Sequence, residues 1–225
     1  MTAISPEKSQ ASDSFAVAFF IILSGGLQDA YTYLGRGGVF ANAQTGNIVL
    51  LATDLFQGQT GRLLNRLVPL SAFLLGIIAA ESICFHLKEE RRLHWRQWVL
   101  LLEILLLFLV AFLPQWLNPL ANALVSFVCA LQVQSFHTVK GHVYASTMCI
   151  GNLRCTAEAF HAYLRSGNRR MLQKAGLYLS VIFLFALGAG LGSLLTTAFA
   201  SYAILASCPL LFVSFLLMNE ADSKQ

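Results

Sequence analysis

Residues 175–219 form a run of 45 residues that contains no Asp, Glu, Lys, Arg or His. A water-exposed surface needs ionic groups throughout, whereas a helix needs only about 20 mostly apolar residues to cross a bilayer. Residues 104–139 form a second run, of 36 residues, without Asp, Glu, Lys or Arg. Each run can hold nearly two crossings, so the lipid bilayer is the expected surrounding of this chain.

The overall composition points the same way. Only 12% of the residues are charged, against about 25% in an ordinary soluble domain. The basic residues flank apolar runs instead of forming a continuous stripe, which argues against a nucleic-acid partner. The five cysteines show no metal-ligand spacing, and no catalytic set of side chains stands out. We therefore expect neither an enzyme nor a bound metal or cofactor.

Hydropathy predicts an all-α, polytopic membrane helix bundle with six to eight hydrophobic segments. A single transmembrane domain is expected over residues 15–218, between a polar N-terminal tail (1–14) and a polar C-terminal tail (219–225). The segments are placed at 15–34, 39–56, 66–87, 97–117, 119–139, 143–164, 174–197 and 201–218.

The two halves of the chain resemble each other, which predicts an internal duplication of about four segments each, over residues 15–117 and 119–218. At an offset of 104, Leu27-Gln28 matches Leu131-Gln132, and after a slip of one residue Gly46-Asn47 matches Gly151-Asn152. The second and sixth segments are too polar to face lipid on all sides. They are therefore the expected location of function, because duplicated membrane bundles commonly bind solutes between their repeats.

Topology depends on whether the second and sixth segments cross the membrane. If both dip in and return, there are six crossings, the repeats are inverted, and most basic residues share the side of both termini. If both cross fully, there are eight spans, the repeats are parallel, and the basic residues divide almost evenly. The positive-inside bias favours six crossings with both termini in the cytoplasm.

Two motifs carry a resemblance to a known family. Gly26-Leu27-Gln28-Asp29-Ala30 lies late in the first segment, and Phe40 to Asn47 reads Phe-Ala-Asn-Ala-Gln-Thr-Gly-Asn. This pattern resembles the YoaK-like family of bacterial multi-pass membrane proteins, domain of unknown function 1275, over essentially the whole chain. Two polar positions of the family's second-half motif are occupied here by Val133 and Ile150. The resemblance implies a helical protein of the bacterial inner membrane and supplies no activity, substrate or cofactor.

The residues expected to bind a solute are polar side chains within apolar segments. They are Gln28, Asp29, Gln44, Thr45, Asn47, Gln132, Asn152 and Arg154. Asp29 is either a group that responds to protons or cations or a cap on the following turn. The Thr-Gly-Asn side chains suit either a broken helix at a cavity or hydrogen bonds between helices. Arg154 and Glu158 are four residues apart and can neutralise each other.

Other buried groups have structural interpretations. Gly188 with Gly192, and Gly76 with Ala80, have the small-xxx-small spacing of close helix packing, either within the chain or in a homo-oligomer. Glu81 either shares a cavity with Asp29 or extends toward the basic residues Lys88, Arg91 and Arg92, and the second account also explains Glu103.

Two functions remain open. The first is a small-solute permease or exporter of the inner membrane, with a polar cavity between two repeats. The alternative is a non-transporting membrane protein that assembles with a partner through its glycine seams and buried amides.

Overall fold

The computed structural model describes residues 14–87 and 94–222, and the chain is all-α apart from one short β-hairpin. The predicted all-α class is confirmed. Residues 1–13, the basic residues Lys88, Arg91 and Arg92, and residues 223–225 lie outside the described residues. The elements are α1 (Phe15–Gly35), α2 (Gln44–Phe56), η2 (Thr60–Arg62), α3 (Leu63–Leu87), α4 (Trp95–Ala111), η3 (Gln115–Leu117), α5 (Asn118–Ser135), β1 (Thr138–Val139), β2 (His142–Val143), α6 (Cys149–Ser166), α7 (Arg169–Phe199), η4 (Ala200–Ala206) and α8 (Ser207–Asp222).

Local sequence signals explain several of the boundaries. The Ser14 hydroxyl accepts a hydrogen bond from the N–H of Ala16 and caps α1. α6 ends at Gly167, whose φ of 64° is the left-handed conformation that glycine adopts readily, and Asn168 then caps α7. The chain therefore turns between α6 and α7 at residues 166–168.

Among the described residues, four helical stretches are long and apolar enough to cross a bilayer: Phe15–Gly35, Thr60–Leu87, Gln115–Ser135 and Arg169–Asn219. The last covers 51 residues and includes both α7 and most of α8. These are the helices of an integral, multi-pass membrane protein. α2, with 13 residues, is not among them, since at about 1.5 Å per residue it reaches only about 20 Å.

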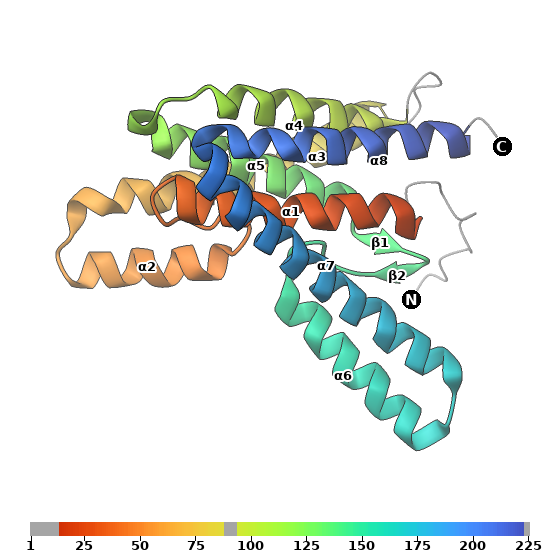
Figure 1. Ribbon diagram of the computed structural model, residues 1–225. Helices are drawn as coiled ribbons and strands as arrows, with labels where there is room; N and C mark the ends of the chain where they lie inside the picture. Colours follow the sequence, from red (N-terminus) through yellow and green to blue (C-terminus); the bar gives the residue numbers. More distant parts are fainter. Residues whose placement is uncertain (1–13, 88–93, 223–225) are drawn as a thin grey trace.

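α1 and α5 lie at the centre of the molecule and run antiparallel. The amide of Gln132 donates to the carbonyl of Ile21 (2.7 Å), near the start of α1 and the end of α5. At the other ends of these helices, the amide of Asn122 donates to the carbonyl of Arg36 (2.8 Å). α7 and α8 pack along α1, whereas α3 and α4 pack along α5 (Figure 1). The first helix of each half therefore packs against the last two long helices of the other half.

The glycine seams join helices within the chain. A methyl group at Gly188 would collide with the carbonyl of Leu23 in α1, and one at Gly76 would collide with the carbonyl of Phe127 in α5. The prediction that both glycines permit close helix packing is confirmed. Their use between copies of the chain is corrected, because α1 and α5 already occupy these faces.

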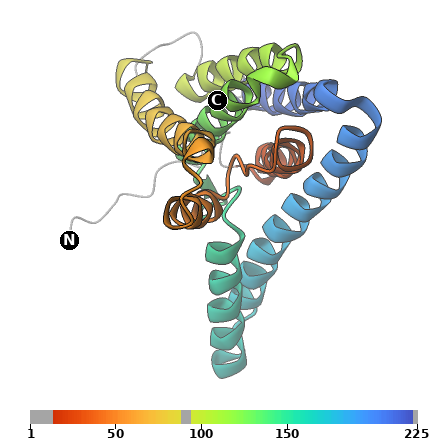
Figure 2. The same ribbon diagram turned by 90° about the vertical axis from the view of Figure 1, so that its left-hand side faces the viewer.

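Two helical arms leave the central bundle. α2 pairs with the first half of α3, and α6 pairs with the first half of α7. Figure 2 shows the α6–α7 arm extending well away from the other helices. α1 begins and α8 ends at the same end of the bundle (Figure 1).

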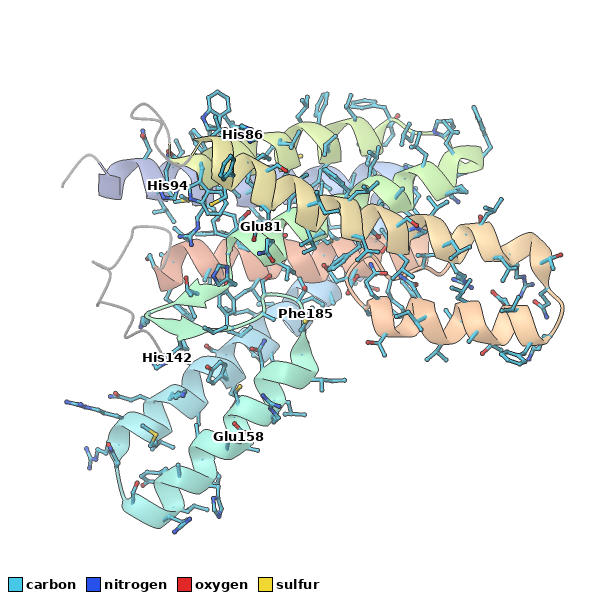
Figure 3. All side chains as sticks on the ribbon, turned by 180° about the vertical axis from the view of Figure 1, so that it is seen from behind. Glu81, His86, His94, His142, Glu158 and Phe185 are labelled. Carbon is cyan, nitrogen blue, oxygen red and sulfur yellow. The ribbon has the colours of Figure 1, made fainter. Side chains whose placement is uncertain are left out.

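The acidic residues Glu103 and Glu81 lie in different surroundings. Glu103 in α4 does not extend toward solvent: it is completely buried, and neither carboxyl oxygen has a hydrogen-bond partner in the described part of the chain. Its position early in α4 suggested that the carboxylate would reach the polar end of the helix, but α5 and α8 pack against α4. Glu81 is exposed and accepts a hydrogen bond from the amide of Gln134 (Figure 3).

Candidate functional site

After α1 ends, the chain turns back toward the middle of the bundle. The backbone N–H of Asn42 donates to Asp29 Oδ1 (2.8 Å), and the Asn42 amide donates to the carbonyl of Gly25 (3.2 Å). Gly25 is the central residue of the 21-residue α1. The chain has therefore returned by about 9–15 Å along α1 before α2 begins.

The segment before α6 reaches the same place from the other half of the chain. The Thr147 side chain lies so close to Gly25 that a methyl group on this glycine would sit 2.8 Å from Thr147 Cγ2. The hydroxyl of Tyr178 in α7 donates to the carbonyl of Val143 (2.9 Å) and holds the start of this segment. Asn42 lies two residues before α2, and Thr147 lies two residues before α6. Both residues thus contact the middle of α1.

Two asparagines hold these segments in the same way. The Asn47 amide donates to the carbonyl of Phe40, and the Asn152 amide donates to the carbonyl of Ala145, both over 2.7 Å and both seven residues back. Such a bond cannot form within an α-helix, which pairs residues four apart. This explains why residues 39–43 and 143–148, expected at the starts of helical segments, precede the helices instead.

The first turns of α2 and α6 open onto one cavity of about 750 Å³. Neither helix has a side-chain cap at its N-terminus. In α2 the N–H groups of Gln44 and Gly46 donate to the carbonyls of Asn42 and Ala43, so the first N–H groups of α6, together with that of Thr45, are the ones available for other partners. Aromatic rings from three elements, those of Phe40, Phe73 and Phe185, supply apolar walls. Figure 3 shows Phe185 beside the first turn of α6. The cavity is therefore polar at the two helix ends and apolar around them.

The structure brings five of the eight expected site residues to this cavity. Asp29, Gln44, Thr45, Asn152 and Arg154 line it.

The other three expected residues are buried elsewhere. Gln28 and Gln132 lie between α1 and α5, where the Gln28 amide donates to Ser24 and the Gln132 amide donates to the Ile21 carbonyl. The Asn47 amide donates to the carbonyl of Phe40 and to the side chain of Gln44, and so holds two residues that line the cavity.

The charged groups of the site are arranged asymmetrically. Asp29 is buried and accepts the N–H of Asn42, so the carboxylate also fixes the segment before α2. Arg154 lies on the opposite, second-half side and is exposed, with its Nε 3.5 Å from Glu158 Oε1. The predicted Arg154–Glu158 pair is confirmed. Since an exposed pair of this kind contributes little stability, the guanidinium remains available to a solute.

The comparisons place the chain among known proteins. The model of one family, described as a protein of unknown function (DUF1275), matches residues 17–217. The chain belongs to the DUF1275 family. No curated protein and no solved structure matches it. The matched region includes every segment that lines the cavity.

In this DUF1275 member, several cavity residues lie outside the set expected from the sequence. Asn42, Phe73, Cys149, Cys155 and Phe185 all line the site. One signal was available: Phe73-Leu74-Leu75-Gly76 and Phe185-Ala186-Leu187-Gly188 share Phe-x-Leu-Gly at an offset of 112. Each Phe lies one turn before the glycine that packs on the other half.

The site holds no candidate metal centre. Within residues 14–87 and 94–222, no three His, Cys, Asp or Glu side chains gather closely enough to hold a metal ion. Its chemistry is that of hydrogen-bond donors at two helix ends, one carboxylate, one guanidinium and apolar walls.

Proposed function

We propose that this protein is a small-solute permease or exporter whose binding site is the cavity between two inverted repeats. The proposal has two parts, the architecture of the repeats and the use of the cavity.

Equivalent contacts in the two halves support a duplication. Gly76 packs on the Phe127 carbonyl and Gly188 packs on the Leu23 carbonyl, and Leu23 and Phe127 are 104 positions apart, the offset found for Gln28 and Gln132. The Asn47 and Asn152 bonds add a second equivalent pair, with identical lengths. Chance similarity of short sequence motifs would not produce matching contacts at matching offsets.

The direction of the central helices supports an inverted arrangement. Equivalent helices α1 and α5 are antiparallel, as their hydrogen bonds at Ile21 and Arg36 require. The two-fold axis that relates them must therefore be perpendicular to the helices, and so lie in the membrane plane. α2 and α6 then enter only half of the bilayer, which leaves six full crossings and both termini on one side.

The charge distribution orients this arrangement. Arg165, Arg169, Arg170 and Lys174 lie around the tip of the α6–α7 arm, toward the end of the bundle where α1 begins. The positive-inside bias therefore assigns this end, with both termini, to the cytoplasmic side of the inner membrane.

The observation that carries the proposal is the meeting of two uncapped helix N-termini, one from each half, at a cavity beside the middle of α1. Broken helices that meet at the bilayer centre between repeats are the usual construction of solute sites in secondary transporters. Because the cavity offers N–H donors together with the Asp29 carboxylate, it suits a small polar solute that both accepts and donates hydrogen bonds.

The test is solute flux through purified protein in liposomes. A panel of radiolabelled amino acids, organic acids, sugars and polyols is first screened for thermal stabilisation of the protein, because a ligand that prefers the folded state raises its apparent stability. Uptake of the stabilising solutes is then measured. The wild type should transport at least one of them, and Asp29→Asn should reduce its flux by about tenfold or more.

A matched control removes a different carboxylate. Glu81→Gln changes an exposed acidic residue of α3 that does not line the cavity, so its flux should equal that of the wild type. Absence of flux for every solute in the panel would contradict the permease and favour the partner-binding alternative. Equal loss in both variants would exclude a specific role for Asp29.

A further inference from the structure

A second cavity lies at the end of the bundle where α1 begins. It has a volume of about 780 Å³ and is bordered by Phe15 of α1, by the β1–β2 hairpin, and by the first three turns of α7. Figure 3 shows His142 on this hairpin. The cavity shares no lining residue with the site between the repeats, so the two cavities are separate.

The cavity is strongly basic. Lys140 from the hairpin and Arg170 and Lys174 from α7 line it together with His142, and within residues 14–87 and 94–222 no Asp or Glu lines it. Lys140 holds a φ of 48° in a two-residue turn with Gly141, a conformation unusual for lysine. The Lys140 ammonium lies 5.4 Å from the centre of the Phe15 ring, which fixes it at the rim.

The cavity also crosses the boundary between polar and apolar surface. Arg170 and Lys174 belong to the charged start of α7, and the uncharged run of residues 175–219 begins at the next position. Phe15, Met171 and Leu177 add apolar walls beside the cations. In a bilayer, this boundary lies at the level of the lipid headgroups.

We propose that this cavity binds an anionic phospholipid, with the phosphate between Lys140, Arg170 and Lys174 and the upper acyl chain against the apolar walls. Cationic pockets at the cytoplasmic ends of membrane helices are suited to such headgroups. A soluble phosphate would use the cations alone, whereas a lipid uses both surfaces. The proposal depends on membrane insertion and is independent of solute transport.

The test is lipid binding to the full-length protein in a neutral detergent, followed by native mass spectrometry. Phosphatidylglycerol is titrated against the wild type, Arg170→Gln/Lys174→Gln, and the matched pair Arg165→Gln/Arg169→Gln. The control pair removes the same charge from the same arm without touching the cavity. Each cation near a headgroup contributes about 1 kcal/mol, and the first double variant removes two of them. It should therefore bind about thirtyfold more weakly than the wild type, and the control pair should bind as the wild type does.

Further measurements separate a lipid site from other sources of binding. Lys140→Arg should retain binding and Lys140→Gln should weaken it, while melting temperatures show that each variant is folded. Equal losses of lipid binding in the two double variants would show that the general surface charge of the arm attracts the lipid, and would overturn the proposal. It would be overturned equally if phosphatidylcholine bound as well as phosphatidylglycerol, or if millimolar inorganic phosphate displaced the lipid.

Discussion

Arg36 is the largest completely buried side chain of the described residues. Its Nε donates to the hydroxyl of Tyr31 (2.7 Å), and its two Nη atoms donate to the carbonyls of Val110 (3.0 Å) and Leu113 (2.8 Å). These carbonyls lie at the C-terminal end of α4 and just beyond it, where the helix dipole favours a cation. Arg36 therefore fastens the end of α1 to the end of α4.

Arg36→Ala should destabilise the protein by about 2–4 kcal/mol, because several buried acceptors lose their donor together. Arg36→Lys should recover only part of this loss, since an ammonium cannot reach three carbonyl and hydroxyl groups in the planar geometry of a guanidinium. The measurement is unfolding of purified protein in detergent. The exposed Arg165 is the control, and an Arg36→Ala protein as stable as Arg165→Ala would refute this role.

At the scale of elements, the contact between α1 and α7 depends on glycine at particular positions. Gly188 faces the backbone of α1, whereas a methyl group at Gly190, two residues along the same helix, would meet nothing within 4 Å. The two glycines thus form a matched pair with opposite surroundings.

Gly188→Ala should destabilise the protein by about 1–3 kcal/mol through overpacking against Leu23. Gly190→Ala should be neutral or slightly stabilising, since alanine is the better helix former. Thermal unfolding of the two variants compares them directly. Equal melting temperatures would contradict the close approach of α1 and α7.

Sequence patterns predicted these elements unevenly. Each apolar segment overlaps a helix, because burial in lipid requires long apolar runs, and the polar second and sixth segments contain the short helices α2 and α6. The extended stretches before α2 and α6 were missed because the bonds of Asn47 and Asn152 depend on tertiary placement. The burial of Arg36 and Glu103 was missed for a related reason, since hydropathy registers a charge without showing which helices cover it.

The candidate site was predictable in outline. The Asp29 and Thr45 motifs indicated the cavity, but Gln28 and Gln132 have the same polarity and face the contact between α1 and α5. The rotation of each helix about its axis decides whether a polar side chain faces the cavity or the contact between α1 and α5. The periodicity of a single sequence predicts this rotation poorly when a helix is apolar on all sides.

At the scale of the whole molecule, the proposed inverted arrangement would place the turn between α2 and α3 on the side of the membrane opposite both termini. Gln59→Cys, introduced into cysteine-free protein in intact cells, should therefore react with a membrane-impermeant thiol reagent added outside. Arg165→Cys, at the tip of the α6–α7 arm, should react only after permeabilisation. Protection of Gln59→Cys in intact cells would instead indicate eight full crossings and parallel repeats.

The most direct test of the central cavity is the aqueous reactivity of its two equivalent rims. Thr45 and Ile150 are 105 positions apart, each precedes a Gly-Asn pair, and both side chains are exposed and line the cavity. Thr45→Cys and Ile150→Cys, each as the only cysteine of membrane-embedded protein, should both be modified by a water-soluble methanethiosulfonate, while Cys129 retained alone should not. If neither rim cysteine reacts until the protein is unfolded, the middle of the bundle is dry and the proposed solute site does not exist.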